Sequence, residues 1–270
     1  MWVNVTFIGE TDHEGVVYDF SYAKKKVKEI IDEQVDHRLV VPTNVLKKSN
    51  DRITFTYTYG FDEKFLTYDS PEEGVVEIPY RNVSYENLQS YLETIVMEQM
   101  PKNISNVRIE LEEEPLEDKA CFHYTHGLKD HYGNCQRLYH GHRNTIEVFV
   151  NGQQNDILEG YLANEVFKGN IHFCYFENVV NKEEIIKLTE NDFPEGVFPD
   201  IPRVEIAYES SQGLFKGSLP GNEIYLLQTE STVENLSIHF AKHIKELVNE
   251  GDKVQVKAYE GIGKGALTTI

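Results

Sequence analysis

The sequence predicts an α+β protein built from two tandem copies of one small unit. Its 270 residues exceed a typical single domain but fit two small ones, and 40% hydrophobic residues can fill a core. Strand-like segments recur in the same order along the chain, with amphipathic helical segments between them. Strands in series with helices segregated from them predict antiparallel sheets with the helices packed on one face.

The repeat can be followed through three pairs of segments. Similar strands end in polar, glycine-containing turns at 2–15 and 145–160. The second pair, at 50–92 and 201–240, consists of an aromatic β stretch, a loop and a helix start around Glu-Asn-Leu. The third pair is the closing strands at 107–114 and 254–261, which match without a gap. We therefore expect a first unit at 1–117 and a second at 118–270.

Apolar residues at helical spacing predict the helices. Residues 20–35 carry one apolar stripe with Lys and Glu opposite, and a second helix is expected at about 85–99 with Ser84 as its N-cap. Its counterpart in the second unit is expected to open with the capping box Ser231-x-x-Glu234. The buried stripe of that counterpart is expected to contain Leu236, Phe240, Ile244, Leu247 and Val248.

The two units differ at their starts. Residues 119–151 predict a strand, a polar loop and a second strand, a hairpin for which the first unit has no counterpart. The first unit begins at the second strand of this pattern, so we expect the true N-terminus to lie further upstream. A missing strand exposes a sheet edge, which predicts that another chain covers it.

Composition narrows the class of partner. A formal net charge of −19 argues against nucleic acid and anionic membranes, because phosphodiester-binding faces are normally rich in Lys and Arg. The first residues lack the pattern of a signal peptide, and no stretch approaches the roughly 18 apolar residues of a membrane span. Three cysteines show no CxxC spacing. These features predict a soluble, cytoplasmic protein.

The strongest chemical signal is His140-Gly141-His142 at the start of a strand. Side chains alternate along a strand, so both imidazoles point to one side. The preceding strand offers His126, or His123, across the expected hairpin. Three histidines on a rigid strand pair leave one tetrahedral position open, which is typical of a catalytic zinc site. The alternative is a surface cluster of histidines without a metal.

Three further places can carry chemistry. Cys135 lies in the loop before His140, where a nearby zinc would favour its thiolate as base or nucleophile; the alternative is an inert loop cysteine. Asp36-His37 ends the first helix, where the carboxylate can orient the imidazole, or the histidine can simply favour the helix dipole. Glu260 ends a strand before a glycine-rich turn, where most glutamates are merely exposed.

These segments resemble the 6-pyruvoyl- and 6-carboxytetrahydropterin synthases, a family with the tunnelling fold. The similar stretches are FHYTH (122–126), CQRLYHGH (135–142), GVVYDF (15–20) with its helix to VDH (35–37), the Glu-Asn helix starts, and VKAYE (256–260). They do not stand in family order, because the Asp-His segment lies in the first unit and the histidine cluster in the second. Each unit has kept a different half of the family's site.

The resemblance implies a zinc site, a general base, a proton relay and a pterin anchor. The residues carried over are His126, His140 and His142 for zinc, Cys135 for the base, Asp36 with His37 for the relay, and Glu260, or its first-unit counterpart Glu113, for the anchor. The second unit has Ile171-His172 where Asp-His is expected, so we expect one composite site per chain or per chain pair.

The implied activity is a zinc-dependent lyase acting on 7,8-dihydroneopterin triphosphate. The product would be 6-carboxytetrahydropterin, a precursor of queuosine and other 7-deazaguanine nucleosides; the alternatives are the 6-pyruvoyl product, a non-catalytic zinc- and pterin-binding protein, or an unrelated zinc hydrolase. Four residues separate Cys135 from His140 where the family usually has three, which predicts a bulge or a longer loop. By analogy, two or three chains are expected to form a homo-oligomer.

Overall fold

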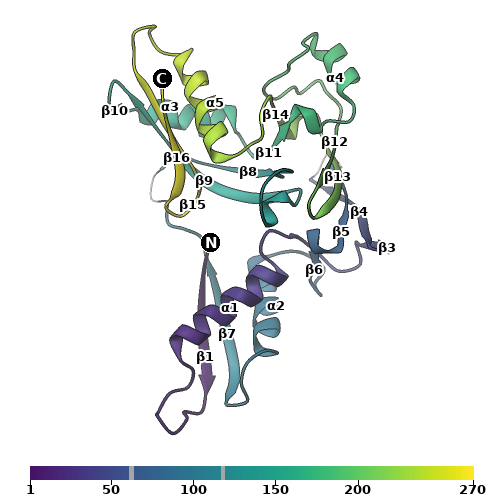
Figure 1. Cartoon of the computed structure of the whole chain (residues 1–270), viewed down its shortest axis with the longest axis vertical. Coiled ribbons are helices and arrows are strands. Elements are labelled where there is room, and N and C mark those ends of the chain that lie inside the picture. The colour runs from purple at the N-terminus through teal and green to yellow at the C-terminus, as the bar shows by residue number, and fades with distance from the viewer. Residues whose placement is uncertain (61–63, 117–118) are drawn as a thin grey trace. The chain divides into compact units, whose positions relative to one another are not determined.

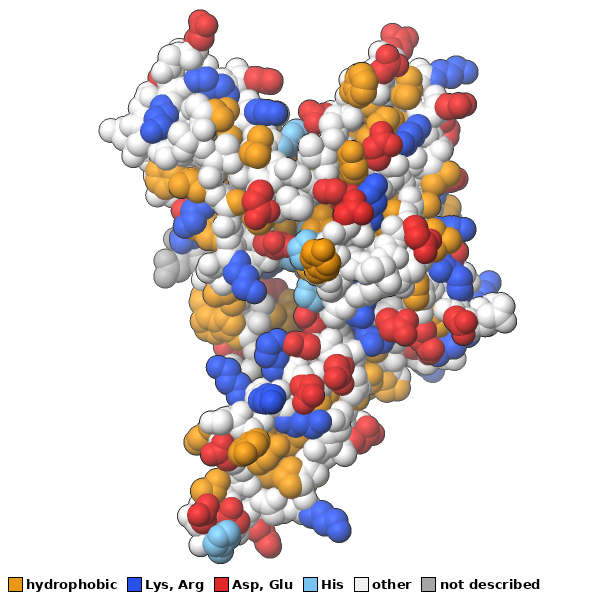
Figure 2. Space-filling model, in the orientation of Figure 1, with side chains coloured by type: hydrophobic (Ala, Val, Ile, Leu, Met, Phe, Trp, Pro, Cys, Tyr) orange, Lys and Arg blue, Asp and Glu red, His pale blue; other side chains and the backbone are white. Residues whose placement is uncertain are grey.

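The computed structural model describes residues 1–60, 64–116 and 119–270 (Figure 1). The chain forms two compact units, one of residues 1–53 and 72–115 and the other of residues 54–71 and 116–270. The expected boundary between 117 and 118 lies outside the described residues. Acidic and basic side chains are interspersed over the surface (Figure 2), and no helix among the described residues is long and apolar enough to span a membrane.

The first unit is built on the antiparallel pair of β1 (Trp2–Gly9) and β7 (Ile104–Glu112), in which Val5 lies opposite Ile109. The helices α1 (Phe20–Gln34) and α2 (Tyr85–Met97) enclose an apolar core with these strands. The short elements of the unit are β2 (Leu39–Val41), β3 (Lys47–Ser49), η1 (Glu72–Gly74) and β6 (Val75–Glu77). Of these, β2 and β6 pair in parallel.

Both helices of the first unit form where the sequence predicts them. The Asp19 side chain caps α1 by accepting hydrogen bonds from two backbone N–H groups, and Ser84 caps α2 by accepting one from Asn87 N at 3.2 Å. In the apolar stripe of α1, Ala23, Val27 and Ile30 are buried, whereas Phe20 at the start of the helix is 91% exposed. The chain leaves the helix through His37, which has a left-handed φ of +57°. Local spacing and caps are therefore sufficient to define these helices.

The second unit contains a sheet with the strand order β14-β11-β8-β9-β15-β16, and β10 pairs with β9. Its strands are β8 (Cys121–His126), β9 (His140–Val150), β10 (Gln153–Gln154), β11 (Asn170–Tyr175), β14 (Ile224–Leu227), β15 (Val254–Gly261) and β16 (Lys264–Thr269). Expected antiparallel pairing is found along β8, β9, β15 and β16. However, β11 runs parallel to both β8 and β14. Long connections that contain helices, rather than tight turns, lead the chain from one of these strands to the next.

A second sheet of this unit joins segments from both halves of the sequence. It places β12 (Val204–Ser210), β13 (Gly213–Leu219), β5 (Lys64–Pro71) and β4 (Arg52–Tyr59) side by side. Strand β13 pairs antiparallel with β5, with Ser218 opposite Thr67, and their hydroxyl oxygens lie 2.7 Å apart. The strand segment 54–71, from the first half of the chain, is thus part of the second compact unit.

The helices of the second unit are α3 (Asp156–Tyr161) with η3 (Leu162–Val166), α4 (Lys182–Thr189) and α5 (Val233–Lys245). Its short helical turns are η2 (Asn134–Gln136), η4 (Phe176–Asn178) and η5 (Gly221–Glu223).

The predicted capping box, with Ser231 as the N-cap of α5, is wrong. Thr232 is the N-cap of α5, accepting from Asn235 N at 3.3 Å. Leu247, expected in the buried stripe, lies beyond the helix and is 49% exposed.

The core of the second unit is rich in aromatic rings. The Phe240 side chain, on α5, is fully buried, and its ring centroid lies 4.7 Å from that of Phe167 and 6.0 Å from that of Phe122. Phe173 of β11 packs into the same cluster. Aromatic pairs at these separations contribute beyond their buried area, so the cluster fixes α5 against the sheet.

We predict that Phe240→Ala destabilises the second unit by about 3–5 kcal/mol, because it removes a ring that no neighbour can replace. Urea unfolding followed by circular dichroism gives the free energy. Ile238→Ala, on the same helix but at a 40% exposed position, is the matched control and should change it by less than about 1 kcal/mol. Equal losses in both variants would contradict the assignment of Phe240 to the core.

Candidate metal centre and active site

The β8–β9 hairpin brings three histidines together. In its antiparallel register His126 lies opposite His140, and Tyr124 lies opposite His142. His126 and His140 are buried, whereas His123 lies three residues before His126, on the other face of β8, and is exposed. The register therefore selects His126, rather than His123, as the histidine that faces the pair on β9.

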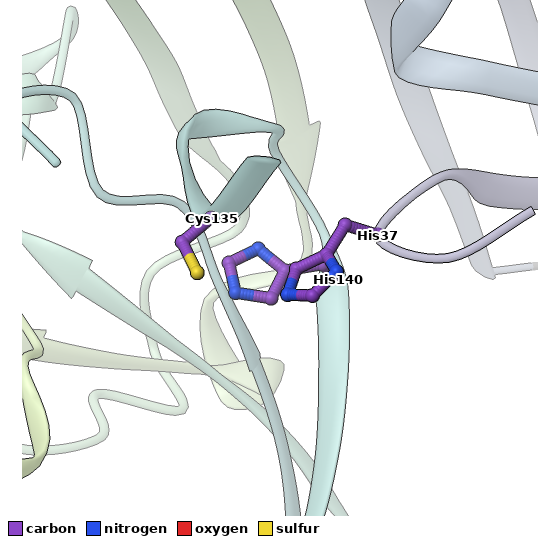
Figure 3. Close-up of side chains that lie close together, drawn as sticks. All are labelled: His37, Cys135 and His140. Atoms are coloured by element: carbon purple, nitrogen blue, oxygen red, sulfur yellow. The ribbon is translucent and has the colours of Figure 1, made fainter. Parts of the chain in front are cut away.

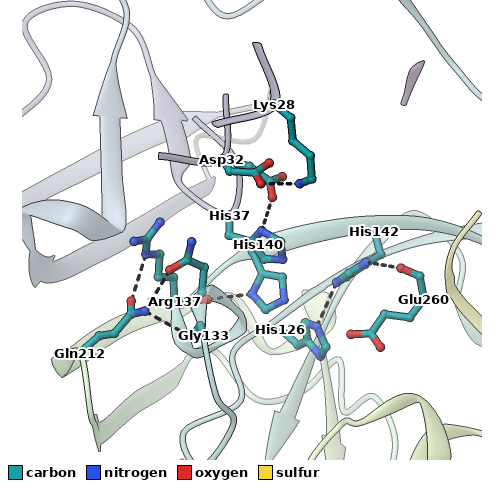
Figure 4. A network of polar contacts seen from close by, with 12 residues as sticks. Lys28, Asp32, His37, His126, Gly133, Arg137, His140, His142, Gln212 and Glu260 are labelled. Atoms are coloured by element: carbon teal, nitrogen blue, oxygen red, sulfur yellow. Dashed lines mark hydrogen bonds and ion pairs between the residues drawn. The ribbon is translucent and has the colours of Figure 1, made fainter. Parts of the chain in front are cut away.

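The three imidazoles have the spacing of ligands around one metal ion. His126 Nε2 lies 3.1 Å from His142 Nε2 (Figure 4), and one nitrogen from each of the three rings lies within 4.8 Å of the others. Two nitrogens bound to a tetrahedral zinc at about 2.0–2.1 Å are about 3.3 Å apart. The site can hold such an ion with only a small adjustment of the rings.

Each ring is held through its other nitrogen. His140 Nδ1 donates to the Arg137 carbonyl at 2.9 Å, and His142 Nδ1 donates to the Glu260 carbonyl at 3.1 Å (Figure 4). His126 Nδ1 lies 3.1 Å from the Ser231 carbonyl and 2.9 Å from its hydroxyl. A carbonyl only accepts, so Nδ1 carries the proton and Nε2 presents its lone pair, as a metal ligand must.

Burial keeps the centre of the cluster neutral. Burial lowers the pKa of His126 well below 6.5, and the neighbouring His140 and His142 lower it further. A charged imidazole would have to lose its solvation in this interior, so the neutral form is favoured near pH 7. Neutral imidazole is the form that binds a metal.

Cys135 lies on η2, next to this cluster. Its Sγ lies within 4.8 Å of a ring nitrogen of His140, and Figure 3 shows the thiol beside the His140 ring. The β12–β13 hairpin fixes the loop: Tyr208 of β12 donates to the Gln136 carbonyl at 2.7 Å, and the Gln212 amide in the turn donates to the Gly133 carbonyl at 3.2 Å. The thiol is thus placed by the second sheet as well as by its own loop.

Tyr139 gives the loop between Cys135 and His140 an unusual backbone conformation. Tyr139 has a left-handed φ of +68°, rare for a residue with a large side chain, and the β8–β9 register runs on from His140 without a shift. Its ring packs against Tyr68 and His172, with centroids 5.7 Å and 5.0 Å away. The sequence predicts a bulge or a longer loop here, and the structure has one left-handed residue whose strained conformation is held by packing.

Asp36 and His37 form a hydrogen-bonded pair in the first unit. Asp36 Oδ2 lies 2.6 Å from His37 Nδ1, and this hydrogen bond lowers the pKa of the Asp36 carboxyl below its usual value. The carboxylate thus orients the imidazole and favours a proton on Nδ1. In the same unit, Glu113 follows β7 and accepts a hydrogen bond from the Tyr85 hydroxyl.

Glu260 lies in the second unit, at an irregularity in β15. The pairing with β16 shifts between Tyr259 and Gly261, which leaves Glu260 as the extra residue of a bulge. Its carbonyl accepts from His142, and Figure 4 shows its side chain beside the histidine cluster. The same residue therefore helps to hold a metal ligand and presents a carboxylate near it.

Four other residues around this site are not among the site residues that the sequence predicts. Ser231 resembles a helix cap but contacts His126. Tyr124 lies on the same face of β8 as His126 and packs against two of the histidines. His172 is buried beside the Thr125 hydroxyl, 2.9 Å away, and burial lowers its pKa to about 3. Burial raises the pKa of Glu230, next to Ser231, to about 7. Of these four residues, only His172 could have been found from the sequence, because Ile171-His172 is the second unit's counterpart of Asp36-His37.

Together, the fold and the site define an α+β protein with a cluster of three histidines that could hold a metal ion and a thiol beside it. The chain belongs to the 6-pyruvoyl tetrahydropterin synthase family, whose family model matches it twice, at residues 1–118 and 115–269. The recognition made from the FHYTH, CQRLYHGH and VDH segments is thereby confirmed.

Individual relatives match part of the chain. A protein of Pyrococcus horikoshii described as "Putative 6-carboxy-5,6,7,8-tetrahydropterin synthase" is 29% identical over 113 residues, 42% of this chain and 65% of the relative's own length. Crystal structures of 6-pyruvoyltetrahydropterin synthase from Plasmodium vivax and Plasmodium falciparum are each 28% identical. They cover 36% and 37% of this chain and 58% and 60% of theirs, with TM-scores of 0.28.

We predict that His126→Ala abolishes stoichiometric binding of zinc, because two imidazoles without the third hold the ion too weakly. Metal content is measured by mass spectrometry of the elements after dialysis against dilute zinc. The matched control is His123→Ala, on the exposed face of the same strand, which should retain the metal. Unchanged zinc in the His126 variant would rule out this cluster, provided that far-ultraviolet circular dichroism shows both variants folded.

We predict that His172 contributes a pH dependence to stability. In the unfolded chain its pKa is about 6.5, whereas the folded pKa is about 3, so below pH 6.5 only the unfolded chain gains the proton. Stability is therefore lost as pH falls, by about 1.4 kcal/mol per pH unit for this one proton. His172→Asn should lose stability less steeply between pH 6 and 4 in metal-free protein, measured by urea unfolding. Parallel curves for the two proteins would contradict the prediction.

Proposed function

We propose that this protein is a zinc-dependent lyase that converts 7,8-dihydroneopterin triphosphate to 6-carboxytetrahydropterin. The observation that carries the proposal is the cluster of His126, His140 and His142, with each Nδ1 bonded to a carbonyl and the remaining nitrogens close together. Three ligands leave room for substrate, unlike a closed structural site. Membership of the family supplies the class of substrate.

The three histidines would hold the zinc, which when bound supplies Lewis acidity toward the side-chain hydroxyls of the pterin. Cys135 is proposed as the base that takes a proton from the substrate side chain. Its loop is fixed by Tyr208 and Gln212, so the thiol needs little reorganisation to reach its position. A cation nearby would favour the thiolate that such a base requires.

Asp36 and His37 are proposed as the proton relay. Their 2.6 Å contact keeps the imidazole oriented, and the lowered pKa of Asp36 keeps its carboxylate ionised beside it. The second unit has no equivalent pair, because Ile171 stands where the aspartate is expected. His172 itself is buried, lies 2.9 Å from the Thr125 hydroxyl and is neutral. We therefore propose one composite site, per chain or per pair of chains, to which each half of the sequence contributes a different part.

Glu260 is proposed as the pterin anchor. A carboxylate accepts hydrogen bonds from the 2-amino group and the neighbouring ring N–H of a pterin at once, in a bidentate pair. The bulge at Glu260 turns this residue out of the regular β15–β16 ladder and places it beside the histidine cluster. Glu113, its counterpart in the first unit, accepts from Tyr85 and is the alternative anchor.

We also propose that the chains associate with one another. Strand β1 carries no charged side chain, although charged residues normally protect an exposed strand edge. An apolar groove of about 460 Å³ lies between β1 and α1, lined by Val5, Phe7, Val27 and Ile31 among others. A second copy of the chain would remove this surface from water, as expected for a homo-oligomer.

The reaction is tested by incubating the zinc-loaded protein with 7,8-dihydroneopterin triphosphate and identifying the products by mass spectrometry. A 6-carboxy product, formed by cleavage of the side chain, supports the proposal. A 6-pyruvoyl product, formed by elimination of triphosphate, supports the lyase but reassigns its product. Unchanged substrate in the presence of bound zinc would contradict the lyase and favour a pterin-binding protein without turnover.

We predict that Cys135→Ala lowers kcat at least about 100-fold, the usual loss when a general base is removed, without changing zinc content. Product formation is followed at saturating substrate. Cys121→Ala, at the start of β8, is the matched control and should keep the wild-type rate. If Cys135→Ala turns over normally, the base must be another residue, and the Asp36-His37 pair becomes the first to test.

A further inference from the structure

Tyr124 occupies a position that brings it against two of the three histidines. It lies directly opposite His142 in the β8–β9 register and two residues before His126 on the same face of β8. Directly opposed side chains on a sheet face are close neighbours, and so are side chains two residues apart on one strand. One ring at this place can contact a ligand on each strand of the hairpin.

The contacts are of two kinds. The Tyr124 ring stacks on His142, with centroids 5.0 Å apart and planes inclined by 26°. It meets His126 edge to face, at 5.2 Å and 85°. These are favourable aromatic geometries, and they hold the two imidazoles at a fixed angle to each other. The Nε2 atoms held in this way are the pair that lies 3.1 Å apart.

Behind Tyr124 is the aromatic core. Its ring stacks on Phe122 at 5.5 Å and meets Phe173 edge to face at 5.0 Å, and Phe173 in turn packs on Phe240. The Tyr124 side chain is 2% exposed, so it cannot swing out without opening this core. Close-packed interiors resist such movement. The rigidity of the core is thus transmitted through Tyr124 to the histidines.

The hydrogen bonds at Nδ1 do not prevent the imidazole rings from tilting, and contact with Tyr124 restricts this tilt for two of them. A bond at Nδ1 fixes one atom of an imidazole, but the ring can still tilt about that atom and carry Nε2 away from its partner. His140 is restrained by the Arg137 carbonyl and by the His126 ring, whose centroid is 4.3 Å away. His126 and His142 have Tyr124 against them, which blocks the tilt.

We infer that Tyr124 is a positioning residue of the metal centre, whose ring holds His126 and His142 at the spacing that a metal ion requires. The role belongs to the aromatic ring and not to the hydroxyl. The inference rests on the metal site of the proposed function, but it concerns how that site is built rather than which reaction it serves. Groups that orient metal ligands typically change metal affinity 10–100-fold when they are removed.

The test compares Tyr124→Leu and Tyr124→Phe in the full chain, without any assay of activity. Zinc affinity is measured by competition with a chromogenic chelator, and the visible absorption of the Co²⁺-loaded protein reports ligand geometry. Tyr124→Leu should bind zinc at least about 10-fold more weakly and show an altered Co²⁺ spectrum. Tyr124→Phe keeps the ring and should retain the wild-type affinity and spectrum.

The matched control is Tyr225→Leu. Tyr225 is 6% exposed and packs on Phe167 and Phe173 in the same core, so its loss disturbs the core in a similar way. It should leave zinc affinity and the Co²⁺ spectrum unchanged. Tyr124→Met, which keeps more of the buried volume, replaces Tyr124→Leu if the latter does not fold.

The outcomes separate this inference from the proposed function. Wild-type affinity and spectrum in Tyr124→Leu would overturn the positioning role while leaving the metal site intact. Equal losses in Tyr124→Leu and Tyr225→Leu would overturn it too, by assigning the effect to general damage of the core. Wild-type protein that binds neither zinc nor Co²⁺ would instead remove the metal site, and this inference with it.

Discussion

The antiparallel register of β8 and β9 is the constraint on which the histidine cluster depends. With His126 opposite His140 and Tyr124 opposite His142, three imidazoles and the ring behind them share one face of the hairpin. A slip by one residue would turn the side chains of one strand to the other face and place Thr125, rather than His126, opposite His140. The register is secured on both sides, because β9 also pairs with β15 and β8 with β11.

The loop of Cys135 connects this hairpin to the second sheet. That sheet is continuous from β12 through β13 to β5, so a segment from the first half of the sequence supports the strands that hold the loop. Arg203 reinforces the junction: its guanidinium lies 3.7 Å from the ring centre of Phe65 and donates to the Phe65 carbonyl at 2.8 Å. The second compact unit therefore includes a segment from the first half of the sequence.

The two halves of the sequence carry different chemical groups. The first half has the oriented Asp36-His37 pair, and the second has the histidine cluster and the thiol. At the second half's corresponding position, His172 is buried and bonded to Thr125, with a pKa lowered to about 3. A histidine that stays neutral through the physiological range cannot exchange protons there, so it acts as a structural side chain. The two halves of the sequence therefore differ in the chemical groups that they carry.

The sequence alone determined the features that depend on local spacing. Alternation predicted that His140 and His142 share a face, and apolar periodicity with Ser84 predicted the first unit's helices. Only the tertiary structure decided what holds the histidines: the carbonyls of Arg137, Ser231 and Glu260, and the ring of Tyr124. Ser231 shows why the sequence alone could not predict these contacts. A serine before a helix satisfies the pattern of a cap, but whether it caps the helix or contacts a histidine 105 residues away depends on packing that no local pattern records.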